Sequence, residues 1–131
     1  MTTHASGTFE VKLEPEETLD KAAGIARMSI SKQFHGDLDA DSKGEMIATM
    51  ETNRSGAYAA IERVTGKLNG RSGSFVLLHN GTMTTDGQQL SVTVVPGSAK
   101  SELEGLAGSM TINIVDRKHF YEFDYTLPAG V

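Results

Sequence analysis

The chain has 131 residues and a formal net charge of -5, with 14 glycines, 3 prolines and no cysteine. This length suits a single domain, residues 1–131, and the acidic balance argues against binding to nucleic acid or to anionic membranes. Without cysteine there are no disulfides or thiolate metal sites, and with no visible signal peptide or bilayer-spanning run we expect a cytoplasmic protein.

Apolar and polar residues alternate in short segments along the chain, which is the pattern of half-buried strands. In chain order these segments are residues 8–13, 28–34, 45–51, 58–68, 71–79, 90–94, 110–114 and 121–127. One further segment, residues 14–26, allows a short helical turn with Thr18 as its N-cap. The patterns therefore predict about eight strands.

Turn residues separate these strands. The pairs Asn69-Gly70, Asn80-Gly81 and Asp86-Gly87 are typical of tight hairpin connections, and residues 39–44 and 116–118 also carry turn residues. Short connections favour antiparallel neighbours. A sheet without covering helices must protect its unpaired edge strands, and closing the sheet into a barrel does this best. We therefore expect an all-β fold, a single antiparallel β-barrel of roughly eight strands, with a two-sheet sandwich as the alternative. Such a barrel holds side chains or one small ligand.

The central hairpin allows its register to be predicted. With Asn69-Gly70 as a two-residue turn, Glu62 faces Leu77, and His79 lies diagonally next to Glu62 on the same apolar face. A turn at Gly70-Arg71 would place Glu62 directly opposite His79, whereas a slip of one residue on one strand would separate them.

An acid and a histidine on an apolar face have two interpretations. They could form a poised acid–base pair that contacts a ligand in a cavity, or they could simply satisfy each other inside the barrel. The residues that we consider as ligand contacts are Tyr58, Glu62, Arg71, Phe75 and His79, with Arg71 near one mouth of the barrel.

Other patterns are weaker. Asp37, Asp39 and Asp41 have the first spacings of a calcium loop, but the positions for its glycine and bidentate glutamate hold other residues. The four histidines form no metal-binding spacing, so we expect no metal and no cofactor. The loop over residues 96–108 is long for a hairpin, and it is either a lid or binding loop or an ordinary exposed crossing.

The hairpin also resembles an uncharacterised bacterial family, one of the domains of unknown function. The shared pattern is Y-x-A-x-E-x-V-x-G-x-L-x-G-R-x-G-S-F-x-L-x-H-x-G, which matches from Tyr58 to Gly81 and is followed by a matching block at residues 94–98. The resemblance implies a barrel similar to plant allene oxide cyclase. It does not imply that enzyme's activity, because its catalytic residues do not map onto this chain.

Three functions remain open at this point, and whether the protein is an enzyme is one of the open questions. The first is binding of a small apolar or amphipathic molecule inside the barrel. The second is a cofactor-independent isomerase or cyclase that uses Glu62 and His79. The third is a structural oligomer without a ligand. We expect a dimer or trimer, because Ile47, Ile61 and Leu78 point away from the inner face.

Overall fold

The computed structural model describes residues 2–49 and 55–128, and within them it forms nine strands and no helix. The strands are β1 Thr3–Asp20, β2 Ile25–Gly36, β3 Leu38–Thr49, β4 Gly56–Leu68, β5 Arg71–Thr84, β6 Gly87–Val94, β7 Lys100–Ser101, β8 Ala107–Val115 and β9 Lys118–Thr126. The described residues thus contain no helix that is long and apolar enough to cross a bilayer.

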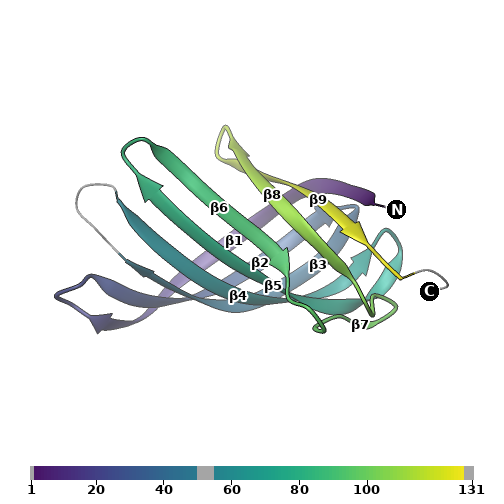
Figure 1. Ribbon diagram of the computed structural model, residues 1–131, viewed down its shortest axis with the longest axis horizontal. Helices are drawn as coiled ribbons and strands as arrows, with labels where there is room; N and C mark the ends of the chain where they lie inside the picture. The colour runs from purple at the N-terminus through teal and green to yellow at the C-terminus, as the bar shows by residue number, and fades with distance from the viewer. Residues whose placement is uncertain (1, 50–54, 129–131) are drawn as a thin grey trace.

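Eight of these strands close into one antiparallel barrel (Figure 1). The hydrogen-bonded order is β4-β3-β2-β1-β9-β8-β6-β5, and pairing of β4 with β5 completes the ring. The two-residue strand β7 attaches to β5 outside this ring order. The prediction of an all-β barrel of about eight strands is confirmed, and the alternative of a sandwich is wrong.

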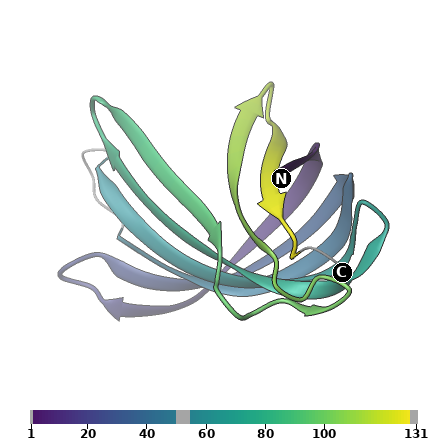
Figure 2. The same ribbon diagram turned by 45° about the vertical axis from the view of Figure 1, so that its right-hand side comes forward.

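One junction in the ring is much shorter than the others. Strands β6 and β8 pair only through Val92 with Met110 and Thr93 with Ser109, whereas β8 pairs with β9 along its whole length. Beyond these two pairs the ribbons of β6 and β8 diverge (Figure 2). The ring is therefore held together between β6 and β8 by two residue pairs only, and the two strands part toward Gly87 and Val115.

Three local predictions are wrong. Residues 14–26 form no helical turn, because β1 continues to Asp20 and pairs with β2 through a hairpin whose turn ends at Gly24, φ 70°. Asn80-Gly81 is not a turn, since β5 continues to Thr84, and residues 39–44 are not a turn, since they lie inside β3. The predicted strand 45–51 is confirmed to Thr49, and its last two residues lie outside the described part of the chain.

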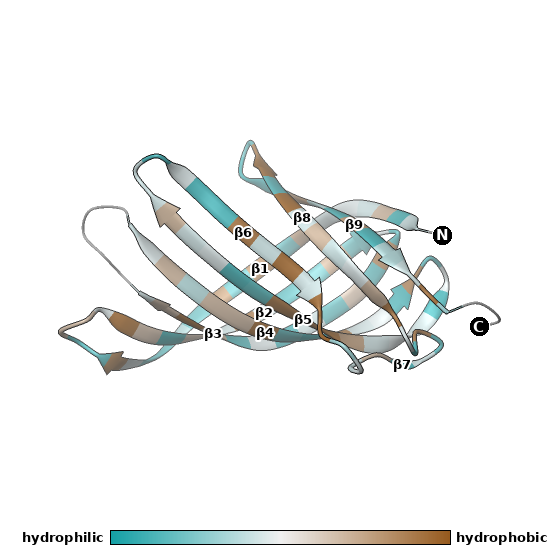
Figure 3. Cartoon of the chain, in the orientation of Figure 1, coloured by the Kyte–Doolittle hydropathy of each residue, from teal (hydrophilic) through white to brown (hydrophobic). Residues whose placement is uncertain are grey.

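Apolar and polar positions alternate along the strands (Figure 3), and the inward apolar side chains fill one end of the barrel. This packed end is built on aromatic side chains, with Phe75 stacked on Phe123 at 5.9 Å between ring centroids. Its largest fully buried residues are Tyr121, Phe34, Phe75, Phe123, Leu38, Leu68, Leu77 and Leu103.

The long loop after β6 closes this packed end from outside the ring. It buries Ala99, Leu103 and Leu106 in the core. The loop is anchored to β5, because the Ser72 backbone N–H donates to the Glu102 carboxylate at 2.8 Å. The segment that we considered as a lid or an exposed crossing is thus an anchored plug.

Candidate functional site

The other end of the barrel encloses an open cavity of about 610 Å³. Its walls are mostly apolar and come from all eight ring strands, including Val11 of β1, Met28 of β2, Met46 of β3 and Ile112 of β8. Large side chains are missing from part of the inner wall, where Ala48 and Gly81 stand instead. The barrel is therefore packed at one end and hollow at the other.

The cavity ends on a charged floor. Lys32 of β2 and His79 of β5 line it, and Glu62 of β4 lies fully buried in contact with both. Lys32 Nζ donates to Glu62 Oε2 at 2.8 Å. His79 Nε2 lies 2.5 Å from the same oxygen, in an orientation that does not meet hydrogen-bond geometry. Three ionisable side chains thus meet where the apolar cavity stops.

The surroundings keep Glu62 ionised. Burial acts to raise the pKa of Glu62, but the contact with His79 and the positive charge of Lys32 outweigh it and lower the pKa to about 2. Lys32 is itself stabilised by the faces of two aromatic rings, with Nζ 4.9 Å from the Phe9 centroid and 5.7 Å from the Phe34 centroid. Lys32 and His79 therefore form the floor, and the ionised Glu62 lies behind them in contact with both.

Tyr58 stands above this floor on the cavity wall. Its ring fits against its cross-strand partner Gly81, where a Cβ atom would come within 2.7 Å of Tyr58 Cε1. The Tyr58 and His79 rings lie 6.4 Å apart. Burial and then the negative charge of Glu62 raise the pKa of the Tyr58 hydroxyl.

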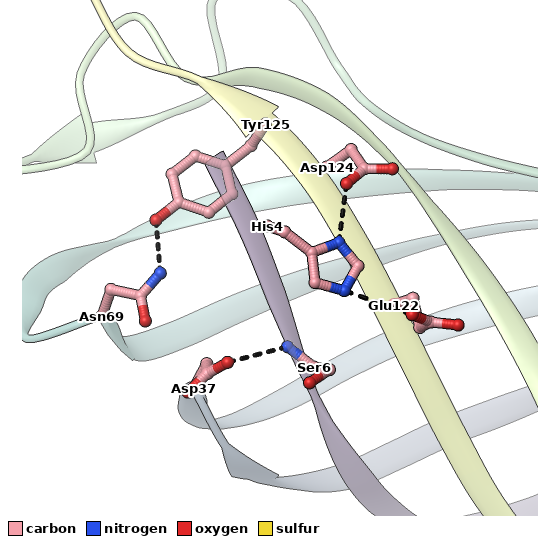
Figure 4. A network of polar contacts seen from close by, with 7 residues as sticks. All are labelled: His4, Ser6, Asp37, Asn69, Glu122, Asp124 and Tyr125. Carbon is pink, nitrogen blue, oxygen red and sulfur yellow. Dashed lines mark hydrogen bonds and ion pairs between the residues drawn. The ribbon is translucent and has the colours of Figure 1, made fainter. Parts of the chain in front are cut away.

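The polar network at the packed end is of a different kind (Figure 4). Asp37 accepts a hydrogen bond from the Ser6 backbone N–H at 3.0 Å, so it ties β1 to the turn between β2 and β3. In the described part of the chain no group of three or more histidine, aspartate or glutamate side chains is arranged to hold a metal ion. This network ties strands and turns together far from the cavity.

A family model described as a protein of unknown function, DUF3224, matches residues 5–125. The chain belongs to the DUF3224 family. A crystal structure of a DUF3224 protein of unknown function from Shewanella oneidensis MR-1 shares 45% identity with it. The two superpose with a TM-score of 0.91, over 98% of this chain and 99% of the other. No protein of curated function matches the chain. The recognition of an uncharacterised family with a barrel fold is confirmed.

The predicted site residues of this DUF3224 chain fall into three places. Tyr58 and His79 line the cavity, and Glu62 lies beneath its floor. Phe75 belongs to the packed end, where it stacks on another ring. Arg71 follows the tight turn that ends β4, at the opposite end of the barrel from the cavity. The first three are thus brought together, and the last two are not.

Sequence reasoning missed Lys32, which completes the floor. The signal was present, because Lys32 shares strand parity with Met28, Ile30 and Phe34. A lysine on the inward parity of a strand needs a partner inside the barrel, and here that partner is Glu62. Ser42, which is directly opposite Lys32 on β3, is also buried, and no hydrogen-bond partner for its hydroxyl lies among the described residues.

Proposed function

We propose that this DUF3224 barrel binds a small amphipathic molecule in its open cavity. The observation that carries the proposal is an apolar cavity of about 610 Å³ that ends on Lys32 and His79. Ligand sites in proteins are concave and mostly apolar, with a few polar groups that orient the ligand. Both features occur here in one place.

The mouth of the cavity supports the same proposal. Four large apolar side chains there, Leu13, Met83, Leu90 and Ile114, are between 39% and 63% exposed and also line the cavity. Exposed apolar residues scattered over a surface need no explanation, but a contiguous set around an opening marks an interaction site. A ligand with an apolar portion would cover these side chains.

The experiment that tests the proposal measures binding of the neutral fluorescent probe phenylnaphthylamine to the native protein. In parallel, protein purified without denaturation is extracted and its small molecules are identified by mass spectrometry. We expect saturable probe binding that falls at least tenfold in Ala48→Phe, because Ala48 lines the cavity. Ala59→Phe on the exposed outer face of β4 is the matched control. Equal binding by both variants would contradict the proposal.

A second candidate is proton transfer on a bound substrate. His79 favours it, since the ring lines the cavity and contacts a buried carboxylate that would stabilise its protonated form. Because the pKa of Glu62 is about 2, Glu62 would act as the anion that orients His79 and not as a proton donor. A co-purified ligand that the protein converts to an isomer, with conversion lost in His79→Gln, would support this candidate.

A further inference from the structure

The floor of the cavity offers hydrogen-bond donors to a ligand. Lys32 has three N–H groups, and its one hydrogen bond to a described side chain goes to Glu62. Lys32 and His79 both line the cavity, while the carboxylate between them lies behind, fully buried. A ligand that reaches the floor therefore meets the ammonium and the imidazole before it meets the carboxylate.

With a proton on His79, the charged groups at the floor carry one excess positive charge, which a bound anion would neutralise. Lys32 and Glu62 compensate each other, and a proton on His79 makes the set two cations and one anion. The other titratable groups on the cavity wall are the Tyr58 hydroxyl and His119 of β9. The Tyr58 hydroxyl and the His119 imidazole carry no negative charge at neutral pH. Among the described residues around the cavity, Glu62 is therefore the one carboxylate in contact with His79.

The apolar part of the cavity runs from this floor to the mouth along the strands. From Lys32 to Met28 on β2, and likewise from His79 to Met83 on β5, the wall extends over four residues. Four residues of strand span roughly 13 Å. This length is close to that of an extended decyl chain, which would lie along Met28 and Leu90.

We propose, building on the proposed function, that the ligand is an amphipathic monocarboxylate. Its carboxylate accepts hydrogen bonds from Lys32 and from protonated His79, and its apolar chain points to the mouth past Met83. Charge-assisted hydrogen bonds of this kind are stronger than neutral ones, so the head group decides affinity among ligands with the same chain.

Competition among matched ligands tests the inference. Decanoate, decanol and decylamine, which share one chain, are titrated against protein that carries phenylnaphthylamine. We expect decanoate to displace the probe at a concentration at least tenfold lower than decanol, and decylamine to be the weakest. If decanol or decylamine is as good as decanoate, or if none displaces a bound probe, the head-group inference is wrong while the proposed function stands. If the probe itself does not bind, the proposed function fails as well.

Variants locate the effect. His79→Gln and Lys32→Met should each remove most of the preference for decanoate over decanol, whereas Lys43→Met, which faces outward on β3, should keep it. Should Lys32→Met fail to fold, His79→Gln still decides. A decanoate preference that is unchanged in His79→Gln would overturn the inference.

Discussion

Gly44 of β3 stands directly opposite Glu62 of β4, and a Cβ atom on Gly44 would lie 2.6 Å from Glu62 Cα. The same atom would lie 2.1 Å from the Ile61 carbonyl oxygen, which is backbone and cannot move aside. The close approach of the two strands therefore depends on a residue without a side chain. The position of the buried carboxylate depends on the absence of a side chain at Gly44 as well as on the hydrogen bond from Lys32.

We expect Gly44→Val to destabilise the barrel by roughly 1–3 kcal/mol, because the added side chain overpacks the contact with β4. Urea unfolding measures the change. Ala59→Val, at an exposed position on β4, is the control and should leave the free energy of unfolding nearly unchanged. A Gly44→Val protein as stable as the control would show that β3 and β4 can separate there without cost.

Removing Lys32 should cost more than removing the whole ion pair. Lys32→Met leaves the Glu62 carboxylate buried without its cation, which should cost roughly 3–5 kcal/mol. The double variant Lys32→Met with Glu62→Leu should recover a large part of this loss, because a buried ion pair replaced by apolar residues is often neutral in stability. A double-mutant cycle in which urea unfolding gives the free energy of each variant checks this. If the losses of the two single variants add up to the loss of the double variant, the two side chains are not coupled.

The sequence predicted the central hairpin well because its turn determines its register. The register observed from Leu68 with Arg71 to Ala60 with His79 is the one expected from Asn69-Gly70, and Asn69 has φ 47°. The diagonal approach of Glu62 and His79 then follows from strand alternation alone. Local chemistry was sufficient here, since both strands are adjacent in the chain.

The rest of the site depends on contacts between strands that are distant in sequence. Lys32 reaches Glu62 across β3, so no short pattern contains both residues. Likewise, nothing local shows that Leu103 of the long loop would fill one end of the barrel. Arg71 and Phe75 point inward from β5 as His79 does, but alternation along a strand does not tell how far along the barrel axis each residue lies. That position along the axis decides whether an inward residue belongs to the packed end or to the cavity.

Stability should depend on pH through Glu62. The folded-state pKa of about 2 lies below the ordinary value of 4.5, so the stabilisation is complete above pH 4.5 and is lost as the pH falls through about 2. The difference corresponds to roughly 3 kcal/mol at neutral pH. Urea unfolding from pH 7 to pH 2 should show a smaller loss in Glu62→Gln than in the wild type. Parallel curves for the two proteins would contradict this assignment.

The expectation of a dimer or trimer remains a prediction, and the outer wall supplies its test. Ile61 and Leu78 face each other across β4 and β5, 56% and 39% exposed, and Ile47 of β3 is 48% exposed. We expect sedimentation equilibrium to give a mass above that of one chain. The double variant Ile61→Thr with Leu78→Thr should lower it, whereas Leu90→Thr at the cavity mouth should not. A wild-type protein that sediments as one chain would end this proposal.

His4 should titrate above its ordinary pKa of 6.5. Its Nδ1 lies 2.7 Å from Asp124 Oδ1 and its Nε2 lies 3.2 Å from Glu122 Oε1, so the hydrogen bond to Asp124 and then the negative charges raise the pKa (Figure 4). The contacts join β1 to β9, and their contribution to stability is present below pH 6.5 and is lost as the pH rises through the folded pKa. An NMR titration of the imidazole measures the midpoint. Asp124→Asn should lower the midpoint more than Glu122→Gln does, because the hydrogen bond to Asp124 is the main cause of the raised pKa. Equal midpoints in both variants and in the wild type would show that the contacts of His4 with Asp124 and Glu122 do not form in solution.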